Sequence, residues 1–243
     1  MGRKDTIYSE KCDAITPFEF NEKVVDVFDD MINRSVPLYR ESVYRQAQMV
    51  EQFYQPDTTV YDLGCSNGNF GLKFLEVMGK KPFHMIAVDN SMPMLATYRL
   101  RLSNRPMGNN IHLACADIKD VPLKNASVVV INLTLQFLPV KERDCLIQSV
   151  YEALCPSGLL LITEKTIHHE PELTHLFQEY YYRFKRENGY SNLEISQKRD
   201  ALENVLIPET VSDHFNRFTS AGFTRMDVWQ KWFNFTSFIC IKT

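Results

Sequence analysis

A strand that opens directly into a loop of small residues constrains this fold more than any other segment. Residues 59–71 read TVYDLGCSNGNFG, in which a run of β-forming residues carries Asp62 and ends at Gly64. An apolar-periodic segment, residues 70–78, follows at once. This order predicts a strand, a tight turn and a helix whose first backbone amides can meet a polar ligand. A plain turn that binds nothing is the alternative that these residues leave open.

The glycine spacing in this loop separates two classes of cofactor. A dinucleotide fingerprint G-x-G-x-x-G that begins at Gly64 requires glycine at positions 66 and 69, where the chain has Ser66 and Asn69. A nicotinamide-dependent enzyme is therefore disfavoured. An acidic residue two positions before the first glycine, within the sequence D-L-G-C, resembles instead the S-adenosyl-L-methionine (SAM) loop of Rossmann-type methyltransferases.

Length and charge narrow the possible partners. A chain of 243 residues suits one large α/β domain with some decoration. Its net charge is −3 and its sequence pI is near 6.1. A protein that grips tRNA or DNA usually carries a basic surplus or stripe, because phosphate neutralisation supplies much of the affinity. The sequence shows neither, so direct binding of nucleic acid is disfavoured.

The cysteine pattern predicts neither a metal site nor a disulfide framework. The six cysteines are scattered, without C-x-x-C or a paired Cys/His spacing. His168 and His169 have no third ligand nearby in the sequence and are interpreted as surface residues. The expectation is therefore a cytoplasmic protein with reduced, mostly buried thiols. No apolar run approaches the ~18 residues of a membrane-spanning helix, and the N-terminus lacks the apolar core of a signal peptide.

Alternating apolar runs and helical periodicities predict a doubly wound sheet. The fourth strand is rich in valine and isoleucine, as expected for a strand that is covered on both faces. Strands are expected at 59–63, 83–88, 111–115, 127–133 and 159–163, and helices at 22–31, 39–53, 69–78, from Ser91 onward, and at 141–154.

The tail predicts a helical insertion and a closing hairpin. Residues 170–206 form one or two long polar helices that break at Asn188 and Gly189, and a further helix covers 211–220. Two strands, 223–232 and 235–241, follow. The expected fold is α/β: a Rossmann-like doubly wound sheet of the SAM-dependent methyltransferase type, with seven strands, an antiparallel last hairpin, and helical N-terminal and accessory segments.

We expect one domain over residues 1–243. Its parts are an N-terminal helical arm, a SAM-binding core, a helical insertion, and a closing helix with its β-hairpin. These parts cover residues 1–55, 56–165, 166–206 and 207–243.

Polar residues follow the second, third and fourth predicted strands. Open α/β sheets bind ligands beyond the carboxyl ends of their strands, so these residues should lie together. A carboxylate at Asp89, next to Asn90, can accept hydrogen bonds from both ribose hydroxyls of an adenosyl ligand. Asp117 and Ile118 can meet the adenine amine and the adenine face. Asn132 lies in an apolar run and must satisfy its amide somewhere.

Each of these positions has a structural alternative. Asp89 can cap the helix that begins near Ser91. Asp117 can be an ordinary turn residue, and Asn132 can bind a backbone loop. Taken together, the positions at the strand ends favour a SAM-binding site.

Six segments spread along nearly the whole chain carry a narrower resemblance. They are VFDDMINRSVPLY (27–39), VYDLGCS (60–66), VDNS (88–91), NLTLQFL (132–138), FKRENGYSNLEISQKRDALENV (184–205) and WFNFTSF (232–238). These segments resemble the carboxy-S-adenosyl-L-methionine synthase family, and the last two lie outside the cofactor core that such methyltransferases share. The chain departs from the family pattern at 67–70 and in the aromatic-rich region 164–180.

The resemblance implies a reaction and its context. SAM would react with prephenate to give carboxy-SAM and phenylpyruvate, and a partner enzyme would use carboxy-SAM to carboxymethylate hydroxyuridine at the tRNA wobble position, giving a 5-oxyacetyl uridine. The family, together with the aromatic-rich accessory segments, implies a homodimer. As the resemblance implies, the SAM pocket is lined by Tyr39, Gly64, Cys65, Ser66, Asp89, Asn90, Asp117, Ile118 and Asn132.

The resemblance also gives a catalytic role to Arg199, which would bind the carboxylate of the product or substrate. A planar guanidinium can hold a carboxylate through two parallel hydrogen bonds, which a lysine cannot do. The alternative is a surface ion pair with Glu194, Asp200 or Glu203. The sequence leaves open whether Arg199 acts within its own subunit or across a dimer.

No histidine or carboxylate stands out in the sequence as a general base. The sulfonium acidifies its methyl group, so proton loss gives an ylide that captures carbon dioxide. The resemblance implies that hydroxide leaving prephenate takes this proton, while the protein holds the reactants and excludes water. Two other functions stay open: a conventional SAM-dependent methyltransferase acting on a small molecule or tRNA, and a non-enzymatic SAM-binding regulator.

Overall fold

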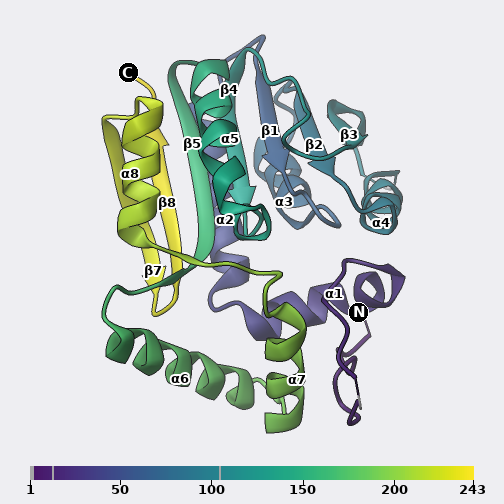
Figure 1. Ribbon diagram of the computed structural model, residues 1–243. Coiled ribbons are helices and arrows are strands. Elements are labelled where there is room, and N and C mark those ends of the chain that lie inside the picture. Colours follow the sequence, from purple (N-terminus) through teal and green to yellow (C-terminus); the bar gives the residue numbers. More distant parts are fainter. Residues whose placement is uncertain (1–2, 13, 104) are drawn as a thin grey trace.

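A mixed β-sheet forms the centre of the molecule (Figure 1). The computed structural model describes residues 3–12, 14–103 and 105–243. The strands are β1 Thr59–Leu63, β2 Met85–Asp89, β3 Ile111–Cys115, β4 Ala126–Asn132, β5 Leu154–Ile167, β6 Glu209–Thr210, β7 Arg225–Trp232 and β8 Phe235–Ile241. Their order is β3-β2-β1-β4-β5-β8-β7, with β6 paired to β5. The strands β1 to β5 pair in parallel, whereas β8 runs antiparallel to β5 and β7.

Helices cover both faces of this sheet. The helices are α1 Glu22–Ser35, α2 Tyr39–Phe53, α3 Asn69–Met78, α4 Met92–Ser103, α5 Val140–Ala153, α6 Pro171–Glu187, α7 Asn192–Leu202 and α8 Val211–Ala221, with short 3-10 turns η1 Gly108–Asn110 and η2 Leu135–Phe137. One core cluster joins the sheet to α2, α3 and α4, and a second joins its other face to α5 and α8. The central strand β4 is therefore buried on both faces.

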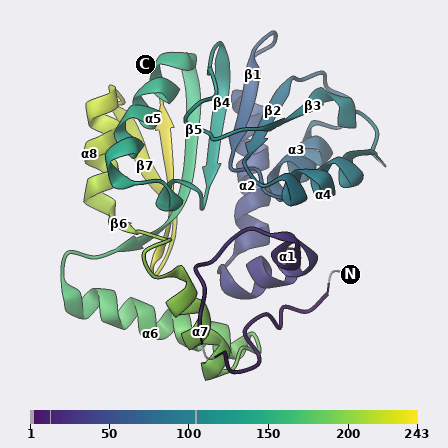
Figure 2. The same cartoon turned by 45° about the vertical axis from the view of Figure 1, so that its right-hand side comes forward.

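Three helices lie beyond the carboxyl ends of the parallel strands. Figures 1 and 2 show α1, α6 and α7 together below the sheet, with the N-terminal segment beside them. A third apolar cluster joins these parts, in which Phe18 and Phe28 pack with Met94 of α4 and Ala201 of α7. The backbone amide of Phe18 also donates to the carbonyl of Ala201. The accessory helices thus form a floor opposite the strand ends.

Side-chain caps fix where the accessory helices begin. Ser191 and Glu194 form a capping box at the start of α7, in which each side chain binds the backbone amide of the other residue. Thr210 and Asp213 do the same for α8.

The sequence predicted the fold class correctly. The expected bounds of β1, β3, α2 and α3 coincide with those observed, and the chain breaks between α6 and α7 at Asn188 and Gly189 as expected. The largest difference is β5, which was expected at 159–163. It continues to Ile167 because Lys165 still pairs with Phe235 of β8, and Thr166 and Ile167 pair with β6. The strand β6 was missed because two residues carry no periodic pattern.

Over the described residues, no helix has both the length and the apolar character needed to cross a membrane. The same residues contain no cluster of three or more His, Cys, Asp or Glu side chains suited to a metal ion. All six cysteines are free thiols.

Candidate active site

A cavity of about 390 Å³ lies between the strand ends and the accessory helices. Side chains and turns that follow β1, β2, β3 and β4 form one side, and α1, α6 and α7 close the other. This volume is typical of a small-molecule site. The cavity is lined by all the residues that the sequence assigned to the cofactor: Tyr39, Gly64, Cys65, Ser66, Asp89, Asn90, Asp117, Ile118 and Asn132.

Glycine is required at the first position of the loop after β1. Gly64 has φ +83°, and a Cβ built there would lie 2.0 Å from Oγ1 of Thr134. The backbone amides of Gly64 and Cys65 both donate to the carbonyl of Val88, 2.9 Å away. The loop therefore lies directly against the end of β2, and the amides of Gly64, Cys65 and Ser66 are all bonded within the protein.

The carboxylate of Asp89 ties this loop to the end of β2. It accepts one hydrogen bond from the backbone amide of Ser66 and one from that of Ser91, each at 2.8 Å. Burial raises the pKa of Asp89, while these amides oppose that rise. The proposed cap of α4 is thus present, and Asp89 still lines the cavity. The structural and ligand-binding interpretations of Asp89 are compatible.

Asp62 is the least satisfied polar group on this side of the cavity. Its side chain is 1% exposed, and its Oδ2 atom has no hydrogen-bond partner among the described residues. Burial, together with the negative charge of Asp89, raises the pKa of Asp62 to about 8. A buried carboxyl oxygen without a donor suits a cationic ligand, such as the ammonium or sulfonium group of SAM. The sequence drew attention to Asp62 only as the acidic residue before Gly64.

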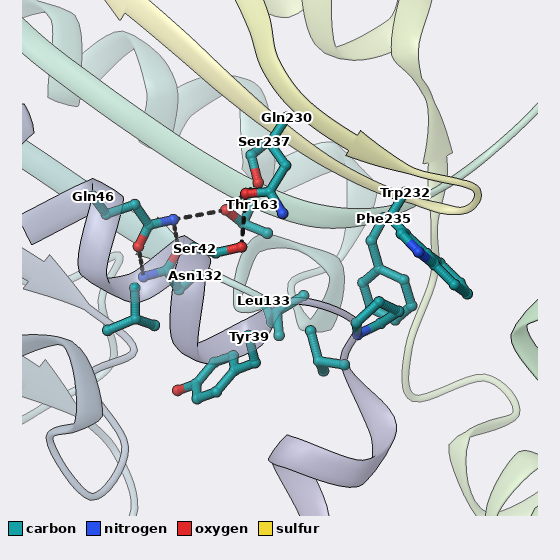
Figure 3. A pocket seen from close by; sticks show the side chains of 13 residues that line it. Tyr39, Ser42, Gln46, Asn132, Leu133, Thr163, Gln230, Trp232, Phe235 and Ser237 are labelled. Atoms are coloured by element: carbon teal, nitrogen blue, oxygen red, sulfur yellow. Dashed lines mark hydrogen bonds between the residues drawn. The ribbon is translucent and has the colours of Figure 1, made fainter. Parts of the chain in front are cut away.

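Asn132 satisfies its amide through a side chain that the sequence did not suggest. Asn132 and Gln46 of α2 exchange hydrogen bonds of 2.8 and 2.9 Å, and Gln46 also donates to Thr163 (Figure 3). Thr163 in turn bonds Ser237 of β8. This buried network joins α2 to three strands and holds the end of β4 in place. Gln46 was missed because its partner lies 86 residues away.

Tyr39 begins α2 beside the loop after β1. Burial raises the pKa of its phenol to about 12, and the nearby carboxyl of Asp62 contributes to the rise. The hydroxyl therefore stays protonated near neutral pH. It is available as a neutral hydrogen-bond donor to a ligand.

Asp117 and Ile118 follow β3 as a turn. The carboxylate of Asp117 accepts from the backbone amide of Lys119 at 3.1 Å and pairs with its ammonium at 3.4 Å. Ile118 is buried and packs into the second core cluster. Asp117 therefore stabilises the turn after β3, and both Asp117 and Ile118 also line the cavity.

The opposite end of the cavity is basic. Lys165 at the end of β5, Tyr181 of α6 and Lys198 of α7 line it. Lys198 is buried, and its Nζ lies 3.9 Å from Oδ2 of Asp5. Burial lowers the pKa of Lys165 and of Lys198 to about 8 each. From the sequence, the basic pair Lys198 and Arg199 is expected either on a solvated helix face or in contact with a small anion, and the burial of Lys198 rules out the first for that residue.

Arg199 does not reach the cavity of its own chain. Its side chain is 57% exposed, and its Nη2 lies 2.9 Å from Oδ1 of Asp200. Neighbouring residues on a helix point in different directions, so the inward position belongs to Lys198. The surface ion pair that the sequence offered as the alternative is present. A role for Arg199 in catalysis stays a prediction.

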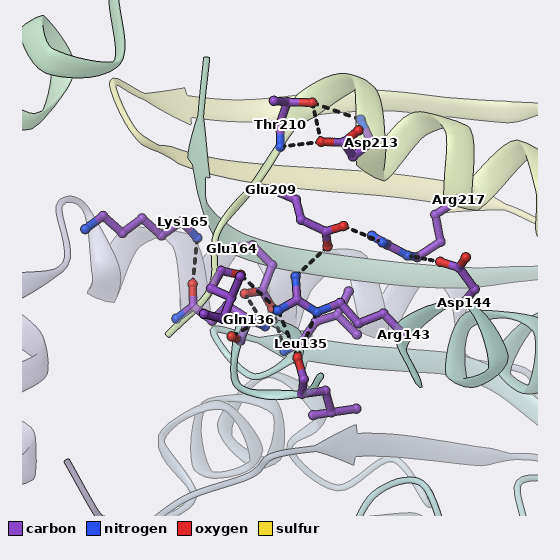
Figure 4. Close-up of polar contacts among 12 residues, drawn as sticks. Leu135, Gln136, Arg143, Asp144, Glu164, Lys165, Glu209, Thr210, Asp213 and Arg217 are labelled. Carbon is purple, nitrogen blue, oxygen red and sulfur yellow. Dashed lines mark hydrogen bonds and ion pairs between the residues drawn. The ribbon is translucent and has the colours of Figure 1, made fainter. Parts of the chain in front are cut away.

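A buried polar network holds the loop after β4 against the cavity (Figure 4). Glu164 accepts hydrogen bonds from the backbone amides of Thr134, Leu135 and Gln136, and burial raises its pKa to about 8. The side-chain carbonyl of Gln136 accepts from the amide of Lys165 at 3.0 Å, while the side chain of Lys165 extends away from the network. The same strand end thus positions the η2 turn and presents a lysine.

The order of the strands and the cavity at their carboxyl ends define a Rossmann-like protein of the SAM-dependent methyltransferase class. Residues 60–158 match the family model for a methyltransferase domain. The fold is similar to that of an S-adenosyl-L-methionine-dependent methyltransferase from Methanococcus maripaludis, with a TM-score of 0.61 and 16% identity over 95% of this chain and 97% of that one.

Curated relatives define the family more narrowly. The chain is 52% identical to carboxy-S-adenosyl-L-methionine synthase of Desulforapulum autotrophicum, over 99% of this chain and 97% of the relative. It is 42% identical to the enzyme of the same name from Shewanella baltica, over 98% of both chains. The chain belongs to the carboxy-S-adenosyl-L-methionine synthase family. It is an enzyme of the transferase class, with SAM as its substrate.

Proposed function

We propose that this enzyme converts SAM and prephenate into carboxy-SAM and phenylpyruvate. The observation that carries the proposal is one cavity with carboxylates at one end and ammonium groups at the other. A cationic sulfonium substrate fits the first end, and a dicarboxylate fits the second. The relatives named carboxy-S-adenosyl-L-methionine synthase support the same product.

The proposed chemistry balances without an external base. Prephenate loses carbon dioxide and hydroxide to become phenylpyruvate, and hydroxide removes a proton from the sulfonium methyl to give water. The resulting ylide forms a carbon–carbon bond with carbon dioxide, which becomes the new carboxylate. No histidine lines the described cavity, consistent with a site that holds two reactants together and excludes water.

The proposed role of the residues follows from their positions. Asp89 and Asn90 would hold the ribose, Asp117 and Ile118 the adenine, and Asp62 the cationic methionine part. The loop from Gly64 to Ser66 and Tyr39 would enclose the cofactor from two sides. Carboxy-SAM would then pass to a tRNA carboxymethyltransferase in the cytoplasm that modifies the wobble uridine.

A homodimer is part of the proposal. Leu173, Leu176 and Tyr180 form an exposed apolar stripe along α6, at the spacing of one helix face. Burying this stripe against a second copy would stabilise a dimer. Light scattering at micromolar concentration should show twice the chain mass of 28.3 kDa. A monomer at that concentration would contradict this assignment.

Arg199 is then proposed to act on the site of the other subunit. Arg199→Ala should abolish carboxy-SAM formation and leave SAM binding intact. Mixed dimers of Arg199→Ala and Gly64→Ala chains test the direction. If Arg199 acts across the dimer, one site in each mixed dimer has both an intact SAM loop and an intact arginine, so activity returns. Mixed dimers without activity would place Arg199 in its own subunit.

Mass spectrometry of the adenosyl product tests the function directly. The purified protein is incubated with SAM and prephenate, and a product heavier than SAM by one carbon dioxide is expected. S-adenosylhomocysteine formed with an added acceptor would instead establish a conventional methyltransferase. SAM binding without turnover of either kind would indicate a regulator.

A further inference from the structure

Three lysines from three different elements converge at the basic end of the cavity. Lys165 comes from β5, Lys185 from α6 and Lys198 from α7. The Nζ atoms of Lys165 and Lys185 lie 5.0 and 5.7 Å from the centre of the Tyr181 ring. Lys165, Lys198 and Tyr181 line the cavity, and Lys185 lies behind them, 4% exposed. We refer to Lys165, Lys185 and Lys198 as the lysine cluster.

The positive charge of the lysine cluster is only partly balanced. Asp5 lies 3.9 Å from Lys198, and within the described parts of the chain no carboxylate lies within 4.0 Å of Lys165 or Lys185. Burial, together with the positive charges of Lys198 and Lys165, lowers the pKa of Lys185 to about 7. The lysine cluster therefore has one carboxylate within 4.0 Å, that of Asp5, while Glu194 acts on Lys185 from farther away.

Two other buried cations of this chain, Arg143 and Arg217, each have a carboxylate within 3 Å, although Nη1 of Arg217 has no hydrogen-bond partner among the described residues. Arg143, 1% exposed, donates to Glu209 and to the backbone carbonyls of Leu138 and Ile207. Arg217 pairs with Glu209 and with Asp144. Burying an unpaired charge is costly, so the excess positive charge of the lysine cluster at the cavity wall favours binding of an anion from outside the chain.

We infer that Lys165 and Lys198, supported by Lys185, bind the carboxylate that the acid substrate retains through the reaction. The inference rests on the proposed function, in which a dicarboxylate loses one carboxyl group and keeps the other. An ammonium group paired with the departing carboxylate would stabilise its charge and oppose decarboxylation. The lysine cluster therefore holds the carboxylate of the side chain that becomes phenylpyruvate, and so orients the ring carboxyl toward SAM.

A purely structural role for these lysines makes a different prediction. Lys165 and Lys198 also lie over aromatic rings, with Nζ 5.0 Å from the Tyr181 centroid and 5.8 Å from that of Phe18. Cation–π packing alone would affect stability and not the recognition of an acid. The test must therefore measure binding of a carboxylate separately from folding.

Calorimetric titration with phenylpyruvate, in the presence of S-adenosylhomocysteine, measures directly how much the lysine cluster contributes to binding of the acid. Lys165→Met and Lys198→Met should each weaken phenylpyruvate binding by about 10- to 100-fold. The control Lys231→Met removes an exposed lysine of β7 and should change it by less than about 2-fold. Thermal unfolding confirms that each variant is folded. If Lys198→Met does not fold because Asp5 has lost its partner, Lys165→Met alone is sufficient for the test.

The methyl ester of phenylpyruvate separates charge recognition from packing. The wild-type protein should prefer the acid to the ester, and Lys165→Met should lose most of this preference, whereas Lys165→Arg should restore part of it. Unchanged acid affinity or an unchanged preference in folded Lys165→Met would overturn the inference.

Turnover distinguishes this inference from the proposed function. The variants should raise KM for prephenate while the affinity for SAM stays within about 2-fold. Suppose that the wild type produces carboxy-SAM and that both lysine variants bind phenylpyruvate normally. The proposed function would then be supported, but the lysine cluster would have no part in binding the acid. If the wild type makes no carboxy-SAM from SAM and prephenate, the proposed function itself is wrong, and the assignment to a retained carboxylate falls with it.

Discussion

The two ends of the cavity differ in charge and in origin. The acidic end contains Asp62, Asp89 and Asp117, all placed by parallel strands of the sheet and the turns that follow them. The basic end contains Lys165 and Lys198, placed by the extension of β5 and by α7. The methyltransferase fold thus supplies a site for a cationic cofactor. The accessory helices supply the basic residue Lys198, which in the proposed function helps to bind the acid substrate.

Under the proposed function, charge separation within one cavity would also link the two substrates. A sulfonium at the acidic end and a dicarboxylate at the basic end would attract one another across a site of low dielectric. Each bound substrate would then favour binding of the other. Variants that weaken one end alone are the sharpest way to test how independent the two ends are.

Gly64→Ala should have the largest effect, and on the acidic end alone. The added Cβ would overlap Thr134 at a residue with φ +83°. We expect SAM affinity to fall by about 100-fold or more, or roughly 3 kcal/mol, in calorimetric titration. Gly79→Ala is the matched control, because Gly79 also has positive φ but nothing lies within 4 Å of its added Cβ. Equal losses in the two variants would refute the steric explanation.

Asp89→Asn should weaken SAM binding by roughly 30-fold, or about 2 kcal/mol, because an amide accepts through only one oxygen. In the wild-type protein, the carboxylate of Asp89 accepts hydrogen bonds from the amides of Ser66 and Ser91, and it also lines the cavity. Phenylpyruvate binding measured alone should change by less than about 2-fold. Asp120→Asn, an exposed change on the same turn as Asp117, is the control. Parallel losses for SAM and phenylpyruvate would show that the two ends are not separable.

The acidic end was predictable from the sequence, and the basic end was not. Parallel strands end at one edge, so Asp89, Asp117 and Asn132 could be placed together from strand order alone. Lys198 and Arg199 are neighbours with similar side chains, and only tertiary packing decides which one faces inward. That packing involves Asp5, almost 200 residues earlier in the chain.

Gln46 and Lys165 were missed for related reasons. The structural role of Gln46 depends on its hydrogen bonds to Asn132, which lies on a strand far away in the sequence. Lys165 lay beyond the expected end of its strand, and the pairing with Phe235 that extends β5 cannot be read from local propensity. The family resemblance named residues that line the cavity, but it did not say which side chains of one chain face one another.

Phenylpyruvate affinity should fall as pH rises from 7 to 9. The pKa of Lys165 and of Lys198 is about 8, so the ammonium groups that attract the carboxylate lose their protons over this range. We expect a loss of roughly 10-fold, since each unit above the pKa removes most of the charged form. Lys165→Met should show a shallower pH profile in the same titrations. Besides the third member, Lys185, the charged or titratable groups around the lysine cluster are Asp5, Glu194, Tyr181, Tyr190 and Arg34.

A flat wild-type profile, or one identical to that of Lys165→Met, would show that these lysines do not carry the charge that binds the acid. The carboxylate of phenylpyruvate stays ionised throughout this range and contributes no slope of its own.

The smallest expected effect is the number of protons released or taken up when a ligand binds, and its sign should differ between the two ends of the cavity. The pKa of Asp62 is about 8 without ligand, so at pH 7 its carboxyl is mostly protonated. A cationic ligand favours the ionised form, and SAM binding should release a fraction of one proton from Asp62. Calorimetry at pH 7 in two buffers of different ionisation enthalpy measures this number. Asp62→Asn cannot release the proton, and the difference between the two proteins removes any contribution from the amino group of SAM. Phenylpyruvate should show the opposite sign, proton uptake, because an anion raises the pKa of the lysines. Release of equal size in Asp62→Asn and wild type would show that Asp62 does not lose a proton when SAM binds, and would contradict this prediction.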